Sequence, residues 1–232
     1  MYNENMFKEI VKNVWVIDEN SFENNTYIIV EKNTCVVIDP SSYYDEIVKF
    51  IEDKHLKLLA IILTHSHFDH FGISNDLANK YKVKIYVHEN EKPMFDMLVV
   101  KEFADVPKQL KFKMSELDWN NIVLYKDHSL KFDDIEFNII FTPGHTYGGV
   151  VLVYNKNIYF TGDTLFPDGI GMMDLPGADI NTLLHSLYKI TRFIKDDDYV
   201  LSGHHKKYSQ YKDFYKTNPY IQQVLSKDFT NK

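Results

Sequence analysis

Cysteine is nearly absent from this chain of 232 residues, which contains only Cys35. A single cysteine excludes an internal disulfide framework, and it leaves no cluster of thiolates to hold a metal ion. Cys35 itself lies in the apolar run Thr-Cys-Val-Val-Ile at 34–38, which predicts a thiol buried in the core.

Long apolar runs are also missing. No run approaches the ~18 residues that span a membrane, and the N-terminal Met-Tyr-Asn-Glu-Asn has no apolar signal core. We therefore expect a soluble, cytoplasmic protein without a membrane partner.

Basic residues are not in excess, since 26 Lys and Arg stand against 33 Asp and Glu and give a formal net charge of -7. Nucleic-acid-binding domains usually carry a basic stripe, so this balance argues against a nucleic-acid partner and leaves a small-molecule substrate. The sequence does not indicate an oligomeric state.

Apolar residues are abundant, at 44% of the chain, and can form one large core, so we expect a single domain over 1–232. Helices are predicted at 41–55, with Ser41 and Ser42 able to cap it, and at 73–81 and 180–194. Strands alternate with these helices in two clusters, which predicts an α+β fold of two packed sheets with helices outside. The predicted strands are 14–17, 26–30, 35–38, 58–63, 84–87, 122–125, 135–141, 150–154, 158–160 and 199–201.

The segment at about 90–120 is amphipathic and rich in Met and Phe, which predicts a helical insert between scaffold strands. It has two interpretations. It could cover the functional site as an apolar lid, and the substrate would then carry an apolar acyl or leaving group. It could instead bury its side chains in a minor core of its own. The side chains concerned are Met94, Phe95, Met97, Leu98, Phe103, Phe112 and Met114.

The chemistry begins where the apolar run at 58–63 ends. His65, His67, Asp69 and His70 occupy six positions directly after this strand, where binding residues on α/β scaffolds gather. In extended backbone, residues two apart point the same way, so His65 and His67 can converge on one ion. Asp69 and His70 come as the chain turns into a helix, and they can address a neighbouring ion. Imidazole with carboxylate suits zinc, iron or manganese.

Three later residues repeat this design. His145 follows the strand at 135–141 through a Pro-Gly turn, Asp163 follows the strand at 158–160, and His204 follows the strand at 199–201. Each strand end therefore delivers one potential ligand.

The ordered motifs His-x-His-x-Asp-His at 65–70, Gly-His at 144–145, Gly-Asp at 162–163 and Gly-His at 203–204 resemble the signature of the metallo-β-lactamase superfamily. The resemblance implies a four-layer αββα sandwich with its metal site along one edge of the two sheets. By matching position, one ion would be held by His65, His67 and His145, and another by Asp69, His70 and His204, with Asp163 bridging both. Asp39 matches a family aspartate that would orient a ligand.

Such a site implies a binuclear hydrolase that uses two divalent ions, zinc first and iron or manganese as alternatives. Two cations about 3.5–4 Å apart share a water and lower its pKa toward about 7, which supplies hydroxide at neutral pH. We expect Asp163 and Asp69 to be catalytic: Asp163 bridges the ions, and Asp69 can orient the nucleophile and pass a proton to the leaving group.

The residues after Asp163 resemble the glyoxalase II-like group, which hydrolyses thioesters such as S-lactoylglutathione. Met172 stands where relatives commonly carry arginine, and only 28 residues follow His204, whereas the classical enzyme has a C-terminal helical extension for glutathione. We therefore expect a substrate that is broader than, or different from, that of the classical enzyme. A hydrolase of a thioester or other small ester-type substrate is the favoured interpretation. A lactonase remains an alternative, although lactonases place tyrosine at the position of Phe166. A persulfide dioxygenase is a second alternative, and such an enzyme uses one iron held at positions matching His65, His145 and Asp163.

The remaining histidines are predicted to be structural. His55 ends a helix, where a cation suits the helix dipole. His88, His128 and His185 are expected in loops or on helix surfaces.

Overall fold

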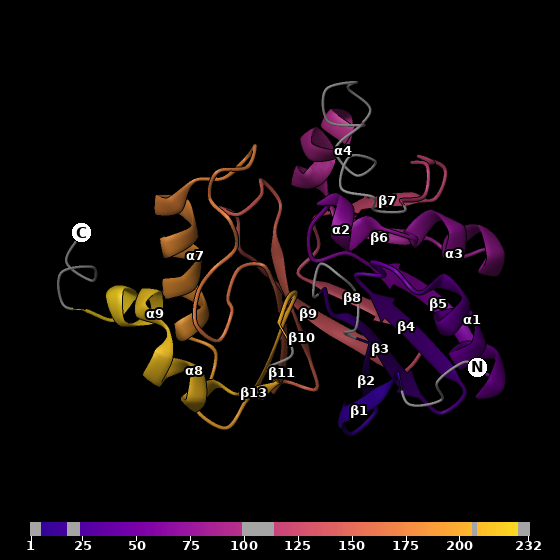
Figure 1. Ribbon diagram of the computed structural model, residues 1–232, viewed down its shortest axis with the longest axis horizontal. Coiled ribbons are helices and arrows are strands. Elements are labelled where there is room, and N and C mark those ends of the chain that lie inside the picture. Colours follow the sequence, from indigo (N-terminus) through magenta and orange to yellow (C-terminus); the bar gives the residue numbers. More distant parts are fainter. Residues whose placement is uncertain (1–5, 18–23, 99–113, 206–207, 227–232) are drawn as a thin grey trace.

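The computed structural model describes residues 6–17, 24–98, 114–205 and 208–226, and two β-sheets facing each other form its centre (Figure 1). The first sheet runs in the order β1-β2-β3-β4-β5-β6-β7, antiparallel as far as β4 and parallel from there. Its strands are β1 Lys8–Val11, β2 Val14–Ile17, β3 Thr26–Glu31, β4 Thr34–Ile38, β5 Lys57–Ile62, β6 Ile85–His88 and β7 Ile122–Tyr125.

The second sheet runs in the order β13-β12-β11-β10-β9-β8, with one parallel pair, β11 and β12. Its strands are β8 Ser129–Phe132, β9 Ile135–Phe141, β10 Val150–Tyr154, β11 Ile158–Gly162, β12 Tyr199–Ser202 and β13 Ser209–Gln210. The helices are α1 Tyr44–Asp53, α2 Phe68–Phe71, α3 Ser74–Tyr81, the 3-10 turn η1 Glu89–Glu91, α4 Lys92–Leu98, α7 Ile180–Thr191, α8 Tyr211–Thr217 and α9 Pro219–Val224.

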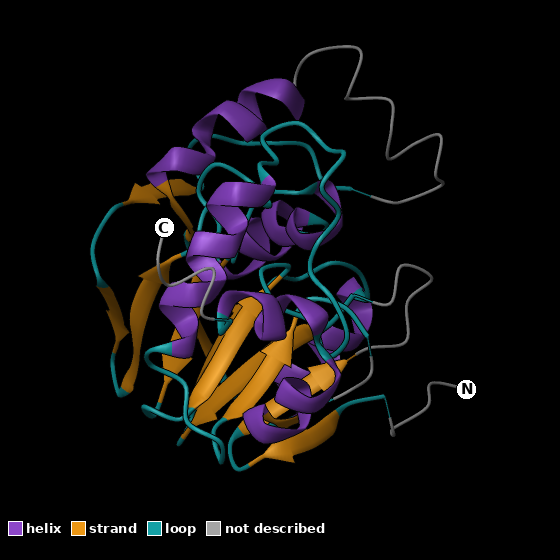
Figure 2. Ribbon diagram, turned by 90° about the vertical axis from the view of Figure 1, so that its left-hand side faces the viewer, coloured by secondary structure: helices purple, strands orange, loops and turns teal. Residues whose placement is uncertain are grey.

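Helices cover the outer face of each sheet, so the molecule has four layers (Figures 1 and 2). One core cluster lies between the sheets, with Tyr27, Phe137 and Phe160 among its buried side chains. A second cluster joins the first sheet to α1 and α3, and a third joins the second sheet to α7 and α9. The predicted αββα sandwich is confirmed. Cys35 is buried in the second cluster, as the apolar run around it predicts.

The predicted strands all form, with ends that differ by one or two residues at most. Three further strands, β1, β8 and β13, have no counterpart in the prediction. The helix predicted at 41–55 begins later, at Tyr44, and the serine cap is wrong: the residue before the helix is Tyr43, with φ 64° and no side-chain capping bond. Ser41 is instead buried, and its N–H donates to Thr26 Oγ1 at 3.1 Å.

The insert predicted at 90–120 is helical only at its start within the described residues, in η1 and α4, and residues 114–121 form no helix. Phe95 is buried and packs edge-on against Phe71 and Trp119, with ring centroids 5.6 and 5.8 Å apart. Met94 faces Gly177, where an added Cβ would lie 3.3 Å from its Sδ. Phe103 and Phe112, and the side chain of Leu98, lie outside the described residues.

His88 corrects a prediction. It does not lie on a loop or a helix surface but ends β6, where it is buried and stacks on Phe141 with ring centroids 4.5 Å apart. Burial lowers the pKa of His88, so it is a neutral core histidine. His128 and His185 are exposed, as predicted.

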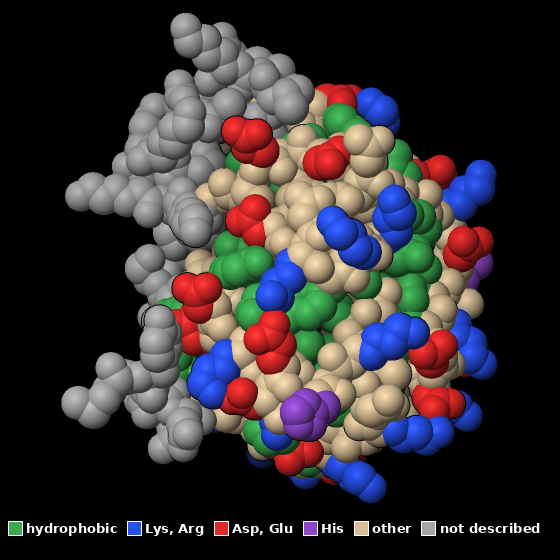
Figure 3. Space-filling view, turned by 90° about the vertical axis from the view of Figure 1, so that its right-hand side faces the viewer, with side chains coloured by type: hydrophobic (Ala, Val, Ile, Leu, Met, Phe, Trp, Pro, Cys, Tyr) green, Lys and Arg blue, Asp and Glu red, His purple; other side chains and the backbone are tan. Residues whose placement is uncertain are grey.

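The surface is mixed in charge. On the face shown in Figure 3, Lys and Arg side chains are interspersed with Asp and Glu. Within the described ranges, every helix is too short or too polar to span a bilayer.

Candidate metal centre

The chain after β5 supplies four polar side chains within six residues. His65 and His67 lie on the loop that follows the strand, and Asp69 and His70 lie on the single turn α2. Parallel strands flank β5, so its carboxyl end opens at the edge of the first sheet, where loops collect ligands.

The second sheet supplies the other three residues at the same edge. His145 lies on the connection between β9 and β10, Asp163 directly follows β11, and His204 comes two residues after β12. The structure therefore brings all seven predicted residues together, from two sheets and from positions 139 residues apart along the chain (204 − 65).

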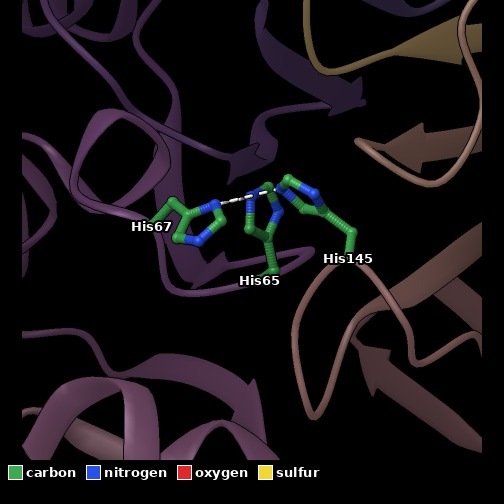
Figure 4. A group of neighbouring side chains, drawn as sticks. All are labelled: His65, His67 and His145. Carbon is green, nitrogen blue, oxygen red and sulfur yellow. Dashed lines mark hydrogen bonds between the residues drawn. The ribbon is translucent and has the colours of Figure 1, made fainter. Parts of the chain in front are cut away.

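Three histidine rings form the first group, and Figure 4 shows them turned toward one another. His67 Nδ1 lies 3.1 Å from His65 Nε2 and 3.0 Å from His145 Nε2. Zinc lies 2.0–2.1 Å from a ligating imidazole nitrogen, which puts two nitrogens of a tetrahedral site about 3.3 Å apart. The spacing of the rings therefore fits one ion.

The second group is Asp69, His70 and His204. His204 Nε2 lies 3.4 Å from Asp69 Oδ2 and 3.3 Å from His70 Nε2. These distances also fit the edges of a coordination shell around one ion.

Asp163 lies between the two groups. One of its oxygens is 3.3 Å from His70 Nε2, and the other is 3.3 Å from His204 Nε2 and 3.5 Å from His145 Nε2. Its Oδ1 is buried and accepts no hydrogen bond from the described residues. A buried carboxylate oxygen without a donor is costly, which suits an atom that would bind a cation.

Without metal, the pKa values of the histidines are shifted in opposite directions in the two groups. Burial first, and then the neighbouring histidines, lower the pKa of His65, and the same causes lower that of His67 to about 3. Burial opposes charge on His70 and His204 too, but Asp163 raises the pKa of both, His70 well above its usual value and His204 to about 10. The first group holds neutral rings at His65 and His67, whereas the second holds imidazolium ions beside carboxylates.

Asp39 orients the second group. It is buried, and both of its carboxylate oxygens have partners. Thr64 N donates to Oδ1 at 2.8 Å, Thr64 Oγ1 donates to Oδ2 at 2.7 Å, and His70 Nδ1 lies 3.0 Å from Oδ2. A carboxylate on Nδ1 turns Nε2 toward Asp163 and His204, where an ion would be held, as the family resemblance implies for Asp39.

Two orienting contacts carry no signal in the sequence. The carbonyl oxygen of Met172 accepts from His145 Nδ1 at 2.9 Å, which leaves Nε2 to face the group. Asn24 donates through Nδ2 to Asp69 Oδ2 at 3.1 Å and forms an isolated β-bridge with His204. Met172 acts through its backbone, which its residue type does not reveal, and Asn24 lies in a segment outside the ligand motifs.

Glycine is required where the backbone passes close to the ligands. A Cβ at Gly203 would lie 2.3 Å from Asp163 Oδ1, and one at Gly171 would lie 2.5 Å from His145 Nδ1. No real Cβ atom makes contacts this short, so any side chain at either position would displace a ligand.

The rim beside His145 is apolar. Tyr147 is 47% exposed and Met172 61% exposed, and Leu175, three residues after Met172, is exposed as well. No lysine or arginine occurs between 164 and 180, where the charged residues are aspartates. Phe166 lies edge-on to the ring of His204 at 5.8 Å.

Comparison with known proteins assigns the family. The model of the metallo-β-lactamase superfamily matches residues 21–204, a range that contains all seven residues of the centre. The chain belongs to the metallo-β-lactamase superfamily.

Proteins with similar sequences match most of the chain. The probable metallo-hydrolase YqgX of Bacillus subtilis is 31% identical over 181 residues, 78% of this chain and 84% of that protein. The hydroxyacylglutathione hydrolase GloC of Haemophilus influenzae is 32% identical over 219 residues, 90% of this chain and 98% of that protein. Among solved structures, BLEG-1 B3 metallo-β-lactamase superposes with a TM-score of 0.78 at 26% identity, covering 90% of this chain and 99% of that one.

Proposed function

We propose that this metallo-β-lactamase superfamily protein is a hydrolase that binds two divalent metal ions, zinc first, and cleaves a thioester or other small ester-type substrate. The observation that carries the proposal is the convergence of five histidines and two aspartates in two adjoining groups with Asp163 between them. Imidazole and carboxylate ligands together suit zinc, and they also suit iron or manganese.

The ligand assignment follows the groups. His65, His67 and His145 would hold one ion, Asp69, His70 and His204 the other, and Asp163 both. Two such ions would supply Lewis-acid polarisation of a carbonyl group and a water of lowered pKa. Asp69, partly exposed at the second group, would orient the attacking water and return its proton to the departing thiolate.

A covalent route through the one cysteine is disfavoured. Cys35 is fully buried in the core, and burial raises the pKa of its thiol to about 12. A buried thiol that stays protonated at neutral pH is a poor nucleophile, so Cys35 is not expected to attack the substrate.

Two observations favour a thioester. GloC, a hydroxyacylglutathione hydrolase by name, aligns with this chain over 98% of its length, so nearly all of a relative with that name is matched here. In addition, the exposed Tyr147 and Met172 offer an apolar surface next to His145, which suits an acyl group or the carbon chain of a thiol.

The test is hydrolysis of S-lactoylglutathione by zinc-loaded and iron-loaded protein whose metal content has been measured. Turnover is expected for the wild-type chain and for Asp127→Ala, which removes an exposed aspartate, and not for Asp163→Ala. Metal binding by His128→Ala should match the wild type, because His128 is exposed and lies outside the centre.

Other outcomes separate the alternatives. Turnover of lactones in place of thioesters would assign a lactonase. Oxygen uptake with glutathione persulfide by protein holding one iron would assign a persulfide dioxygenase. A metal-loaded protein that turns over none of these substrates would remove the proposed activity.

A further inference from the structure

Glu91 is a buried carboxylate beside the metal centre that is not one of the seven ligand residues. It closes the 3-10 turn η1 and has no solvent exposure. Its Oε2 accepts from Ser66 N at 2.8 Å and from Ser66 Oγ at 2.5 Å, and its Oε1 accepts from Gly148 N at 2.6 Å. A carboxylate is costly to bury, and these three donors offset that cost.

The two residues that Glu91 holds belong to different sheets. Ser66 stands between His65 and His67 on the loop after β5, in the first sheet. Gly148 comes three residues after His145, on the connection from β9 to β10 in the second sheet. One carboxylate therefore ties together the two segments that carry the whole three-histidine group.

The close approach at Gly148 shows that this contact is built into the backbone. A Cβ at Gly148 would lie 2.6 Å from Glu91 N and 2.9 Å from Glu91 Cγ, so a larger residue does not fit. The turn is also closed within itself, because Gly144 N donates to Thr146 O at 2.9 Å and Thr142 N to Gly149 O at 2.8 Å. Displacing Gly148 would thus move the whole turn and His145 with it.

The second group is supported by other residues. Asp39 contacts His70, and Asn24 contacts Asp69 and His204. Among the described contacts, none joins Glu91 to a residue of that group. Glu91 therefore supports the first group without contacting the second, whereas Asp39 contacts His70 directly and reaches His65 only through Thr64 Oγ1, which lies 3.1 Å from His65 Nδ1.

We propose that Glu91 is a positioning residue for the three-histidine site, which sets the distance of His145 from His65 and His67. The inference rests on the proposed function, since it requires that this group binds an ion. Outer contacts of this kind typically change metal affinity about 10–100-fold when they are removed.

Glu91→Gln isolates the effect. A glutamine amide keeps the volume but has one oxygen, so it can accept from Ser66 or from Gly148 and must turn its NH₂ group toward the other N–H. Ser66→Ala is a milder change, which removes the hydroxyl donor alone. Glu89→Gln is the matched control, since Glu89 is exposed on the same 3-10 turn.

The experiment is a cobalt titration, because the absorption bands of bound Co²⁺ report its coordination geometry. Two parent variants allow each group to be measured alone. His204→Ala disables the second group and leaves the first, and His67→Ala disables the first and leaves the second. Each background is combined with Glu91→Gln, Ser66→Ala and Glu89→Gln, and affinity is measured against a competing chelator. Urea denaturation of the metal-free forms measures any loss of folding stability separately.

In the His204→Ala background we expect Glu91→Gln to weaken cobalt binding about 10–100-fold and to shift the absorption bands, with a smaller change for Ser66→Ala and none for Glu89→Gln. In the His67→Ala background Glu91→Gln should leave affinity unchanged. Equal weakening in both backgrounds, or none in the first, would overturn the inference.

If Glu91→Gln does not fold, Ser66→Ala decides between these outcomes. A wild-type chain that binds no cobalt overturns the proposed function and the role of Glu91 with it. A chain that binds cobalt but hydrolyses no ester loses only the proposed activity, and the affinities still test Glu91.

Discussion

The two groups of the metal centre should release different numbers of protons when they bind metal ions. In the metal-free chain, burial disfavours charge on His70, but Asp163 and Asp39 raise its pKa well above its usual value. The pKa of His204 is raised to about 10 in the same way, by Asp163 and Asp69. Both rings must lose a proton to become ligands, so the second ion should displace about two protons at pH 7.5.

The three-histidine group should behave differently. Burial and neighbouring histidines lower the pKa of His65 and His67, so neither ring holds a proton to be displaced at neutral pH. Each displaced proton changes the binding constant tenfold per pH unit, about 1.4 kcal/mol. The affinity for the second ion should therefore rise about 100-fold per pH unit above neutrality, and the affinity for the first should stay nearly constant.

The pH dependence of folding gives an independent check without metal. A histidine whose pKa is raised on folding stabilises the folded chain at any pH below its pKa in the unfolded chain. The contribution of His70 and His204 is therefore present below pH 6.5 and is lost as the pH rises, toward about 10 for His204. The lowered pKa of His67 acts in the opposite sense, since stability falls as the pH drops from 6.5 to about 3. Considering these three histidines alone, we expect the metal-free protein to be most stable near pH 6.5.

Calorimetry in buffers of different ionisation enthalpy counts the protons. The wild-type chain should show a first phase with little proton release and a second with about two protons released. His204→Ala should show the first phase alone, and His128→Ala should match the wild type, because His128 is exposed outside the centre. A second phase that releases no more protons than the first would refute this account of the electrostatics.

Three substitutions test single contacts. Asp39→Asn cannot accept from His70 Nδ1 in the same way, so a chelator should remove the second ion about 10–100-fold more readily. Gly203→Ala places a Cβ 2.3 Å from the carboxylate shared by the two groups and should abolish binding of two ions, measured as metal per chain, whereas Gly169→Ala, with nothing within 4 Å, should bind as the wild type does. Met172→Arg adds an exposed cation beside the site and should lower KM for S-lactoylglutathione by up to about 5-fold with kcat unchanged, since a surface ion pair contributes at most about 1 kcal/mol. An unchanged KM would show that the substrate carboxylates lie elsewhere.

The strands that could be predicted from the sequence are those that carry their own apolar signal. β4 and β10 lie inside their sheets and are continuous apolar runs, so composition alone identifies them. β1 and β8 are edge strands with alternating or exposed side chains, Lys8–Val11 and Ser129–Phe132. Each pairs with the next strand across a two-residue turn, β1 with β2 and β8 with β9, so its strand conformation comes from the hairpin and not from an apolar run of its own.

The start of α1 was mispredicted for a related reason. Ser41 has the side chain of a cap, but its carbonyl oxygen lies where Gly72 packs, and a Cβ at Gly72 would be 1.8 Å from it. Tertiary packing therefore fixes Ser41 outside the helix, and this overrides its local preference for a capping position.

The side chains of the centre could be anticipated because each follows a strand, and loops at strand ends collect at one edge of a sheet. Asn24 and Glu91 could not. Asn24 reaches His204 across 180 residues, and Glu91 reaches Gly148 across 57, so only the packing of the two sheets creates these contacts. His88 shows the reverse error, since a polar residue type at a strand end proved to be part of the core.

Both groups of the centre draw ligands from both sheets, so their geometry depends on how the sheets are joined near each group. Next to His145, the joining bonds are those from Gly148 N to Glu91 and from Val150 N to Thr64 O, at 2.6 and 3.0 Å.

Next to His204, a different set of bonds joins the sheets. Asn25 N donates to Gly203 O at 2.8 Å, and Asn25 Nδ2 and Tyr27 OH both donate to Ser202 O, at 2.9 and 2.6 Å. Each group is thus fixed by its own bonds across the sheets, and Asp163 is the residue that both share. Substitutions in one set of bonds should therefore change metal affinity at the neighbouring group more than at the other group, and the fold should be retained.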